Sequence, residues 1–345
     1  MNDRQQAILG FMKQKKSANR QEIQDFITSY FNKASRITII RDLDVLEKSG
    51  KIKKTGINRA VRYEYFASPL LDTIDADKYF DEDQDKRKLI NEYFNFNIWD
   101  NLHNLFTSKE KADLALVNEK YLESRAKMSS TLLKKEMERI TIELAWKSSQ
   151  IEGNTYTLLD TENLIKGGVE AKGKTHAEAV MILNHKKAIE YVFAKPKDSA
   201  KLTLRKTEDL HRILVDGLDV KFGMRDHKVG ITSTKYRPLD NMHQIKDALE
   251  QLVKILNVTK NPAEKAMIAV LMISYIQPFE DGNKRTSRIL GNALLLAYDY
   301  CPMSYRSVSE EEYKKAMLLF YEQNSAYYFK RIFIEQFKFA VDKYF

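Results

Sequence analysis

Two long apolar stretches in the C-terminal half of the chain flank a short polar segment. Residues 263–276 are almost wholly apolar, and residues 286–298 form a second apolar stretch. Runs of this length favour buried helices over strands. Pro278 disfavours helical geometry at the residue before it, so the first helix is expected to end there. The pattern therefore predicts two buried helices joined by a tight turn, which lies at the N-terminus of the second helix.

A further helix is predicted over residues 132–152, where apolar residues recur at helical spacing between charged positions. Gly153 follows it and suits the position that ends a helix. Ser148 and Glu152 are four residues apart, so they share one face. Together these patterns predict a mainly α-helical domain over residues 91–345, which is long enough to form a full hydrophobic core.

Residues 1–66 are predicted to form three short helices and a β-hairpin. The helices are expected over 3–14, from Asn19 onward, and from Ser35 to Leu46, with Asn19 and Ser35 as N-cap residues. The apolar positions of the third helix are Ile37, Ile40, Leu43 and Leu46. The two expected strands are 51–54 and 60–66. This small α+β pattern resembles the winged helix-turn-helix domain of bacterial repressors.

Residues 67–90 separate this pattern from the helical domain. The segment is broken by Pro69 and carries seven acidic residues, which are Asp72, Asp75, Asp77, Asp81, Glu82, Asp83 and Asp85. We interpret it as a solvated acidic connector.

The charge of the chain is concentrated at its N-terminus. The whole chain has a formal net charge of +9, and residues 1–66 hold 14 Lys and Arg against 7 Asp and Glu, which is +7 of that total. In a winged helix, the third helix would reach DNA bases and the wing would contact phosphates. The candidate DNA-binding residues are Arg36, Thr38 and Arg41 on the helix, and Lys53, Lys54, Arg59 and Arg62 on the wing. A protein–protein role for this domain stays open, and so does a homodimer reading two half-sites.

Other global features favour a cytoplasmic protein. Cys301 is the single cysteine, so an internal disulfide is excluded. The first ten residues are polar and do not resemble a signal peptide. No apolar run reaches about 18 residues, so no membrane span or membrane partner is expected.

The polar segment between the two apolar helices has the chemistry of a phosphate site. Gly282 and Asn283 would lie at a helix N-terminus, where free backbone N–H groups bind anions. Arg285 and Arg288 are three residues apart and share one helical face. Asp281 offers the hard oxygen ligand that Mg²⁺ prefers.

Residues 277–288 as a whole resemble the signature of the Fic family, H-P-F-x-D/E-G-N-G/K-R-x-x-R, with Gln277 in place of the first His. The resemblance implies a helical-bundle fold, and transfer of AMP from ATP to a hydroxyl of a target protein. It implies that Asp281 holds Mg²⁺. It also implies a nucleotide-binding set of Gly282, Asn283, Lys284, Arg285 and Arg288. Gln277 stands at the catalytic position, but an amide does not accept a proton near neutral pH.

Two further segments match the same family. Ser148, Glu152 and Gly153 resemble its inhibitory motif, which implies that Glu152 reaches Arg288 and blocks placement of the γ-phosphate. The region 223–238 resembles its β-hairpin flap, where a target segment pairs by strand addition. The expected flap residues are Ile231, Thr232, Ser233, Thr234, Lys235 and Tyr236. Of the six histidines, only His227 is a candidate substitute base.

Three functional hypotheses follow. The main one is an ATP- and Mg²⁺-binding transcriptional regulator whose DNA binding responds to nucleotide and whose AMP transfer is impaired by Gln277. The first alternative is an autoinhibited protein AMP-transferase, acting on another protein or on itself, with Gln277 either natural or engineered. The second alternative is an adaptor that no longer binds nucleotide.

Overall fold

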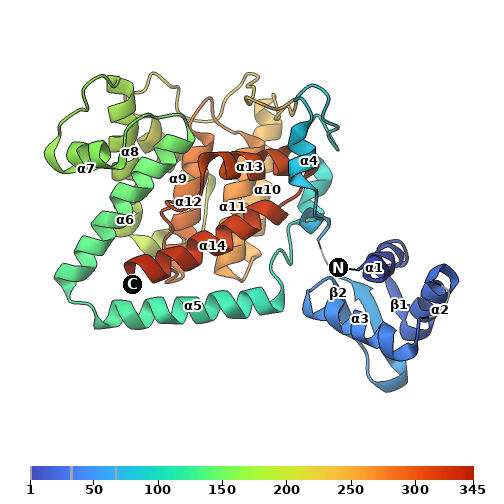
Figure 1. The fold of residues 1–345 in the computed structure, drawn as a ribbon. Coiled ribbons are helices and arrows are strands. Elements are labelled where there is room, and N and C mark those ends of the chain that lie inside the picture. The colour runs from blue at the N-terminus through green and yellow to red at the C-terminus, as the bar shows by residue number, and fades with distance from the viewer. Residues whose placement is uncertain (1, 32–33, 67) are drawn as a thin grey trace. The chain divides into compact units, whose positions relative to one another are not determined.

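The computed structural model describes residues 2–31, 34–66 and 68–345 and divides the chain into two compact units (Figure 1). Unit 1 comprises Met1–Leu71 and His103–Asp113, and unit 2 comprises Asp72–Leu102 and Leu114–Phe345. The division falls near residue 71, within the expected connector 67–90. The return of residues 103–113 to unit 1 was not predicted.

Unit 1 has the element order helix, strand, helix, helix, strand, strand. Its elements are α1 (Asp3–Lys15), β1 (Ser17–Asn19), α2 (Arg20–Phe31), α3 (Arg36–Lys48), β2 (Ile52–Thr55), the 3-10 turn η1 (Asn58–Ala60), β3 (Arg62–Tyr65) and the 3-10 turn η2 (Pro69–Leu71). The antiparallel sheet has the order β1-β3-β2, with Glu64 of β3 opposite both Ser17 and Lys53. The expected helices and hairpin are present. Strand β1 is additional, because three residues are too few to show a period in the sequence.

The core of unit 1 differs from the expected pattern on one helix. Ile39 of α3 is fully buried, whereas Ile37 is 64% exposed. Asp42 is also buried on α3, where it accepts hydrogen bonds from Arg4 and Gln5. The register predicted for α3 was therefore wrong at Ile37, because the buried stripe of this helix includes a paired acidic residue.

Unit 2 is helical, as predicted. Its elements are α4 (Ala76–Asp81), the 3-10 turn η3 (Phe96–Asn101), α5 (Ser108–Lys127), which begins in unit 1, α6 (Ser130–Ile151), α7 (Leu158–Gly167), α8 (His176–Ala194), the 3-10 turn η4 (Pro196–Ala200), α9 (Leu204–Val215), α10 (Met242–Val258), α11 (Pro262–Ile276), α12 (Asn283–Ala297), α13 (Glu310–Gln323) and α14 (Tyr327–Tyr344).

Helices α11 and α12 form the centre of unit 2, as the apolar stretches predicted (Figure 1). Every residue of α11 from Ala263 to Ile276 is buried. The two helices approach closely at Gly291, where a Cβ would lie 2.7 Å from Cγ2 of Val270. Helices α6, α8 and α9 contact α12, while α10 and α13 contact α11. The central pair thus fixes the turn that joins it.

The expected β-hairpin flap is not formed by paired strands. Residues 223–238 run as an irregular loop, and the one bridge there is an isolated parallel pair, Tyr93 with Arg237. Buried Arg225 binds the carbonyl oxygens of Gln277, His227 and Leu239 from this region. Side chains therefore hold this backbone where strand pairing was expected.

The acidic segment is attached to unit 2 over most of its length, although its acidic side chains are largely exposed, as expected. Residues 72–90 belong to unit 2. Ser325 donates to the carbonyl of Asp72, Tyr328 donates to that of Ile74, and the backbone N–H of Ile90 donates to the carbonyl of Glu322. The acidic composition concealed this attachment, because mostly backbone carbonyls make the contacts.

None of the helices in the described residues combines the length and the apolar character that crossing a membrane requires.

Candidate functional site

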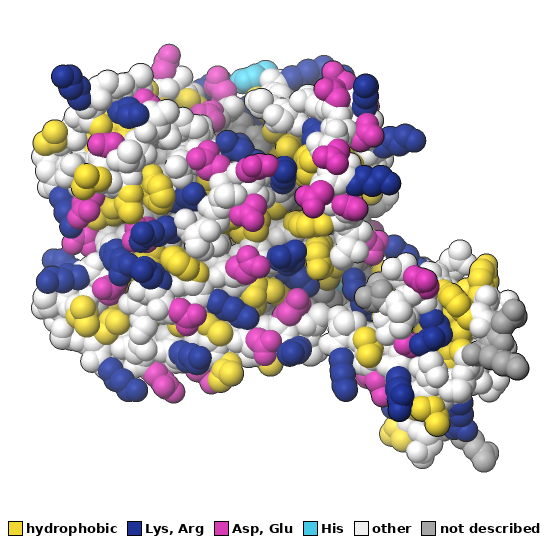
Figure 2. All heavy atoms as spheres, viewed as in Figure 1, with side chains coloured by type: hydrophobic (Ala, Val, Ile, Leu, Met, Phe, Trp, Pro, Cys, Tyr) yellow, Lys and Arg dark blue, Asp and Glu magenta, His cyan; other side chains and the backbone are white. Residues whose placement is uncertain are grey.

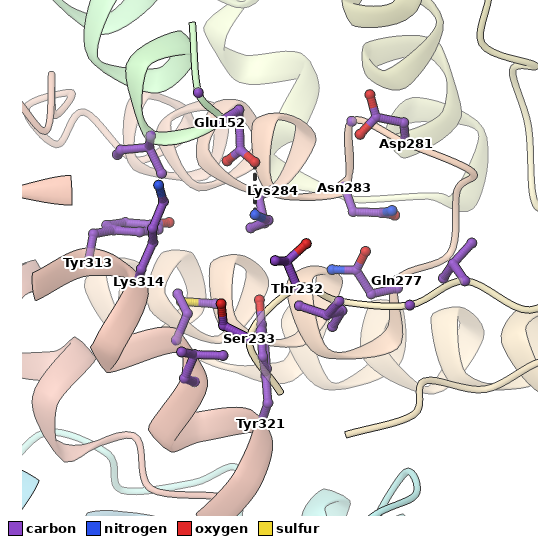
Figure 3. A pocket seen from close by; sticks show the side chains of 18 of the residues that line it. Glu152, Thr232, Ser233, Gln277, Asp281, Asn283, Lys284, Tyr313, Lys314 and Tyr321 are labelled. Atoms are coloured by element: carbon purple, nitrogen blue, oxygen red, sulfur yellow. Dashed lines mark ion pairs between the residues drawn. The ribbon is translucent and has the colours of Figure 1, made fainter. Parts of the chain in front are cut away.

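A cavity of about 460 Å³ opens at the turn between α11 and α12 (Figure 3). Four segments form its walls: the end of α6, the loop 229–233, the turn 277–284 and one face of α13. The lining residues are Ile151, Glu152, Gly153, Val229, Gly230, Ile231, Thr232, Ser233, Gln277, Glu280, Asp281, Gly282, Asn283, Lys284, Tyr313, Lys314, Met317, Leu318 and Tyr321. The structure thus brings together the predicted inhibitory, flap and phosphate segments around one space.

The turn brings the backbone at the N-terminus of α12 close to a neighbouring side chain. Gly282 is the N-cap residue with φ 76°, and a Cβ there would lie 3.1 Å from Val215. The side chain of Asn283 accepts from the N–H of Phe279 at 2.9 Å and donates to its carbonyl at 2.8 Å. Asn283 therefore closes the turn with its side chain. Its backbone, with that of Lys284, belongs to the first helical turn, whose N–H groups lack partners within the helix.

The two motif arginines do not line the cavity. Arg285 is buried and donates to the carbonyl of Leu214 at 3.2 Å and to the carboxylate of Asp281 at 2.8 Å. Asp281 itself lies at the rim, with its side chain 64% exposed. Arg288 is fully buried and faces the ring of Tyr313, whose centroid is 5.3 Å away. The shared face of the two arginines, expected from their spacing, is thus occupied by protein groups.

Glu152 lies at the C-terminal end of α6 and pairs with two cations of α12. Its carboxylate is 2.7 Å from Nη2 of Arg288 and 2.9 Å from Nζ of Lys284 (Figure 3 marks the second pair). Burial alone would raise the pKa of this carboxyl, but the charges of Arg288 and Lys284 outweigh burial and lower it to about 2. Glu152 is therefore ionised at neutral pH and neutralises the positive end of the cavity.

A buried histidine, His185, is linked to Arg288 of this ion pair through the hydroxyl of Ser148. Nδ1 of His185 lies 2.9 Å from the carbonyl of Met181, which can only accept, so we assign the proton to Nδ1. Nε2 then accepts from the hydroxyl of Ser148 at 2.8 Å, and that hydroxyl oxygen accepts from Nε of Arg288 at 2.9 Å. Burial and the charge of Arg285 lower the pKa of His185 to about 3, so the ring is neutral.

This role of His185 was missed in the sequence, where it was interpreted as a core or surface residue. No motif marks it, because Ser148 and His185 meet only through the packing of α6 on α8.

Gln277 ends α11 in the left-handed conformation, with φ 51°. Its side-chain Nε2 donates to the carbonyl of Ser274 at 2.7 Å, and the residue lines the cavity. No histidine is among the lining residues of the described chain. His227, the candidate substitute base, does not line the cavity, is half exposed and lies 3.2 Å from Asp226.

His211 lies beneath the same turn. Its ring stacks on Phe279 with centroids 3.8 Å apart, and its Nε2 lies 3.0 Å from the carbonyl oxygen of Asp281, to which it donates. Burial lowers the pKa of His211 to about 4, so it too is neutral. Phe279 is fully buried.

The predicted flap residues divide into two groups. Ile231, Thr232 and Ser233 line the cavity. The other three are engaged elsewhere: Thr234 accepts from the N–H of Tyr236, Lys235 donates to the carbonyl of Asp85, and Tyr236 is buried with its hydroxyl on the carbonyl of Tyr275.

The α13 wall was not predicted from the sequence. Tyr313, Lys314, Met317, Leu318 and Tyr321 line the cavity at helical spacing. Asn324, at the end of α13, lies outside the lining residues, where its side chain binds Asn95 and the carbonyl of Phe320.

The predicted DNA-binding residues lie on unit 1. Arg36 and Arg41 of α3 are exposed, as are Lys53 and Lys54 of β2. Thr38 is half-buried, and its hydroxyl lies 2.8 Å from that of Ser35.

The remaining wing residues are Arg59 and Arg62. The side chain of Arg59 lies outside the described residues. Arg62 donates to Ser17 and pairs with Glu22 at 3.5 Å, so part of its charge is engaged. Hydrophobic side chains also reach the surface of this unit (Figure 2). Ile37 and Val45 of α3 are among its exposed hydrophobic residues.

Comparisons with known proteins find similarity to one family over part of the chain. The model of the Fic/DOC family matches residues 201–295. Protein adenylyltransferase fic-1 of Caenorhabditis elegans is 24% identical over 189 residues, which are 53% of this chain and 37% of that protein. Protein adenylyltransferase Fic of Drosophila melanogaster is 28% identical over 162 residues, which are 46% of this chain and 33% of that protein. The chain therefore matches only about a third of the length of these curated relatives.

Solved structures show the same fold. Fic-1 (residues 134–508) of C. elegans aligns with a TM-score of 0.56 at 20% identity, covering 68% of this chain and 70% of that chain. A Fic family protein from Desulfovibrio desulfuricans G20 aligns with a TM-score of 0.55 at 20% identity, covering 69% and 74%. The protein is thus a mainly helical one with a Fic fold. The matched segment, residues 201–295, is a Fic/DOC domain and contains the whole turn 277–288.

Proposed function

We propose that unit 2 binds ATP with Mg²⁺ in the cavity and acts as an autoinhibited protein AMP-transferase whose transfer step is weakened by Gln277. The single observation that carries the proposal is the ion pair between Glu152 and Arg288, which are 136 residues apart. It joins the two motif segments at one cavity, beside the free N–H groups of α12. The relatives named protein adenylyltransferase support the reaction class.

The residues of the turn fit a triphosphate and its metal ion. The N-terminus of α12 and Lys284 offer donors and positive charge to phosphate oxygens. Asp281 would hold Mg²⁺, which would neutralise charge on the phosphates when bound. Among the described residues, no group of three His, Cys, Asp or Glu could hold a metal ion. The remaining ligands of the ion would therefore be phosphate oxygens and water.

In the proposed reaction, the hydroxyl oxygen of a target forms a bond to the α-phosphorus of ATP. The bond from that phosphorus to the oxygen bridging the β-phosphorus breaks, and pyrophosphate leaves. The proton of the hydroxyl must also leave. Gln277 cannot take it, so it passes to water or to a phosphate oxygen, and the contribution of a general base, about 10²–10⁴-fold, is lost.

Autoinhibition follows from the same contacts. Arg288 already has its charge neutralised by Glu152 and its Nε bound by Ser148. A γ-phosphate would have to displace the carboxylate to reach this arginine. Loss of Glu152 would free both Arg288 and Lys284 for the nucleotide.

The test is label transfer from α-labelled ATP in four proteins: the unsubstituted chain, Glu152→Gly, Gln277→His and the double variant. The double variant is expected to label itself or an added protein strongly, and Glu152→Gly alone about 10²–10⁴-fold more slowly. Adding Arg288→Ala to the double variant is the control that should remove labelling. If the double variant binds ATP but transfers no label, the AMP-transferase proposal fails. If no variant binds ATP in a calorimetric titration, the adaptor alternative is favoured.

Unit 1 supports a second candidate function, DNA binding. The supporting observation is the exposure of Arg36 and Arg41 on α3 together with Lys53 and Lys54 on β2. Replacing Lys53 and Lys54 by Ala should reduce the slope of log affinity against log salt by about one unit for each lost phosphate contact. Unchanged slopes would favour a protein–protein role for unit 1. A shift of DNA affinity with saturating ATP would support a nucleotide-responsive regulator, and equal affinities would contradict it. A dimer reading two half-sites would appear in the same titrations as binding of two chains.

A further inference from the structure

A buried ionic cluster joins the segment 72–90, called the strap below, to the end of α13. Nη2 of Arg87 is 3.2 Å from Oε1 of Glu322, and their side chains are 6% and 0% exposed. Tyr79 of the strap donates its hydroxyl to the other carboxylate oxygen at 2.7 Å. The guanidinium also lies over the ring of Phe80, at 5.2 Å from its centroid. Burying two charges is costly, so this pair is weakly explained by stability alone.

The same arginine reaches the wall of the cavity. Nη2 of Arg87 donates to the carbonyl of Ser233 at 2.6 Å. Ser233 lines the cavity and has φ 67°, a left-handed conformation that a serine keeps only where its surroundings hold it. Two residues on, Lys235 donates to the carbonyl of Asp85 in the strap at 2.9 Å. The strap and the loop are therefore linked in both directions.

The loop has little other support for its backbone. In the described part of the chain, backbone–backbone hydrogen bonds tie Arg225 to Pro278 and Arg237 to Glu92, but none is made by residues 226–236 between them. Ile231, Thr232 and Ser233, which face the cavity, lie in this interval. Their position thus depends on side chains: Arg225 binds the carbonyl of His227, and Arg87 binds within the cavity wall itself.

We propose that Arg87 is a positioning residue for the nucleotide cavity, which it serves by holding the loop wall 231–233 through the carbonyl of Ser233. Glu322 and Tyr79 anchor the guanidinium so that its position does not depend on the loop. The effect of Arg87 on nucleotide affinity rests on the proposed function of unit 2. Its holding of the loop does not depend on that function.

The experiment compares Glu322→Gln with the double variant Arg87→Met, Glu322→Gln in the full chain. Replacing Arg87 alone would leave a buried carboxylate unpaired, which is strongly destabilising, whereas removing both charges avoids that penalty. Glu322→Gln keeps the acceptor for Tyr79 and leaves the hydrogen bond from Arg87 to Ser233 in place. The two proteins share the loss of the ion pair. They differ in the link to the loop and in the guanidinium charge, which Glu322→Gln leaves buried without its carboxylate, and exchange in α12 reports any resulting difference in global stability.

Hydrogen exchange of the loop amides that have acceptors, those of Arg225, Tyr236 and Arg237, is the first measurement. Relative to exchange of α12 in the same protein, we expect it to be about tenfold or more faster in the double variant than in Glu322→Gln, because a charge-assisted hydrogen bond to the loop is lost. Equal exchange of the loop in the two proteins would overturn the proposal. Arg87→Lys, which keeps a donor and a charge, should restore slow exchange.

ATP affinity is the second measurement, made with Glu152→Gly in every protein so that Arg288 is free. The dissociation constant of the double variant is expected to be about three- to tenfold higher than that of Glu322→Gln. If the dissociation constants are equal while the loop exchanges faster in the double variant, the proposed link between Arg87 and nucleotide binding is overturned. If ATP binds to none of the proteins, the proposed function of unit 2 fails, and the exchange comparison still decides whether Arg87 holds the loop.

Discussion

The ion pair between Glu152 and Arg288 predicts that folding stability and nucleotide binding compete for the same arginine. Changing Glu152 to Gln keeps the shape of the side chain and removes its charge. Breaking a buried ion pair by removing one partner costs about 3–5 kcal/mol. The lowered pKa gives a second magnitude: a fall from 4.5 to about 2 corresponds to about 3 kcal/mol at about 1.4 kcal/mol per pKa unit. We therefore expect the free energy of unfolding to fall by about 3 kcal/mol at pH 7.

The pH dependence of this difference has a definite sign. The pKa of Glu152 is lower in the folded chain than in the unfolded chain. Its stabilisation is therefore fully present above the unfolded pKa of about 4.5 and is lost as the pH falls toward the folded pKa of about 2. The stability difference between the unsubstituted chain and Glu152→Gln should accordingly be constant from pH 7 to pH 5 and shrink below that.

Urea denaturation with and without ATP and Mg²⁺ measures both effects. A ligand at 100 times its dissociation constant adds about 2.7 kcal/mol, and this gain should appear at lower ATP concentrations in Glu152→Gln than in the unsubstituted chain. Glu162→Gln is a matched control, since its ion pair with Lys166 on α7 is exposed and should contribute little. Equal unfolding free energies for Glu152→Gln and the unsubstituted chain, at all ATP concentrations, would refute the reasoning.

Two further predictions concern the interior of unit 2. His185 and His211 have pKa values lowered to about 3 and 4, so the unfolded chain binds more protons below pH 6.5 and stability should fall with decreasing pH from there to about pH 4. Each contributes a slope of about 1.4 kcal/mol per pH unit, and His185→Gln should remove one such increment in a denaturation series. In Gly291→Ala, the new methyl group would meet Val270 at 2.7 Å. Overpacking between α11 and α12 should lower the free energy of unfolding by about 1–3 kcal/mol. An unchanged melting temperature would show that the two helices can move apart without cost.

The local pattern of the chain was sufficient for much of the fold. The apolar runs correctly predicted α11 and α12, and Pro278 correctly placed the end of α11. The N-cap predicted at Ser35 is present, because capping depends on residues a few positions apart. The prediction failed at Ile37, where the apolar pattern alone could not show that Asp42 occupies a buried position.

The cavity depends both on the local sequence and on tertiary packing. Gly282 and its φ of 76° follow from the local demand of a tight turn at a helix start. The pairing of Glu152 with Arg288 was expected only through the family resemblance, because helical spacing places a residue on a face without naming its partner.

The amino-acid sequence by itself determined the central helices, the turn between them and the absence of an ionisable base at residue 277. Only the tertiary structure decided that His185 supports Arg288, that α13 forms a wall of the cavity, and that Arg87 of an acidic segment holds the loop at Ser233. The physical reason is the range of the forces involved. Helix periodicity and turn chemistry act over a few residues, whereas a buried polar atom must find its partner wherever packing brings one.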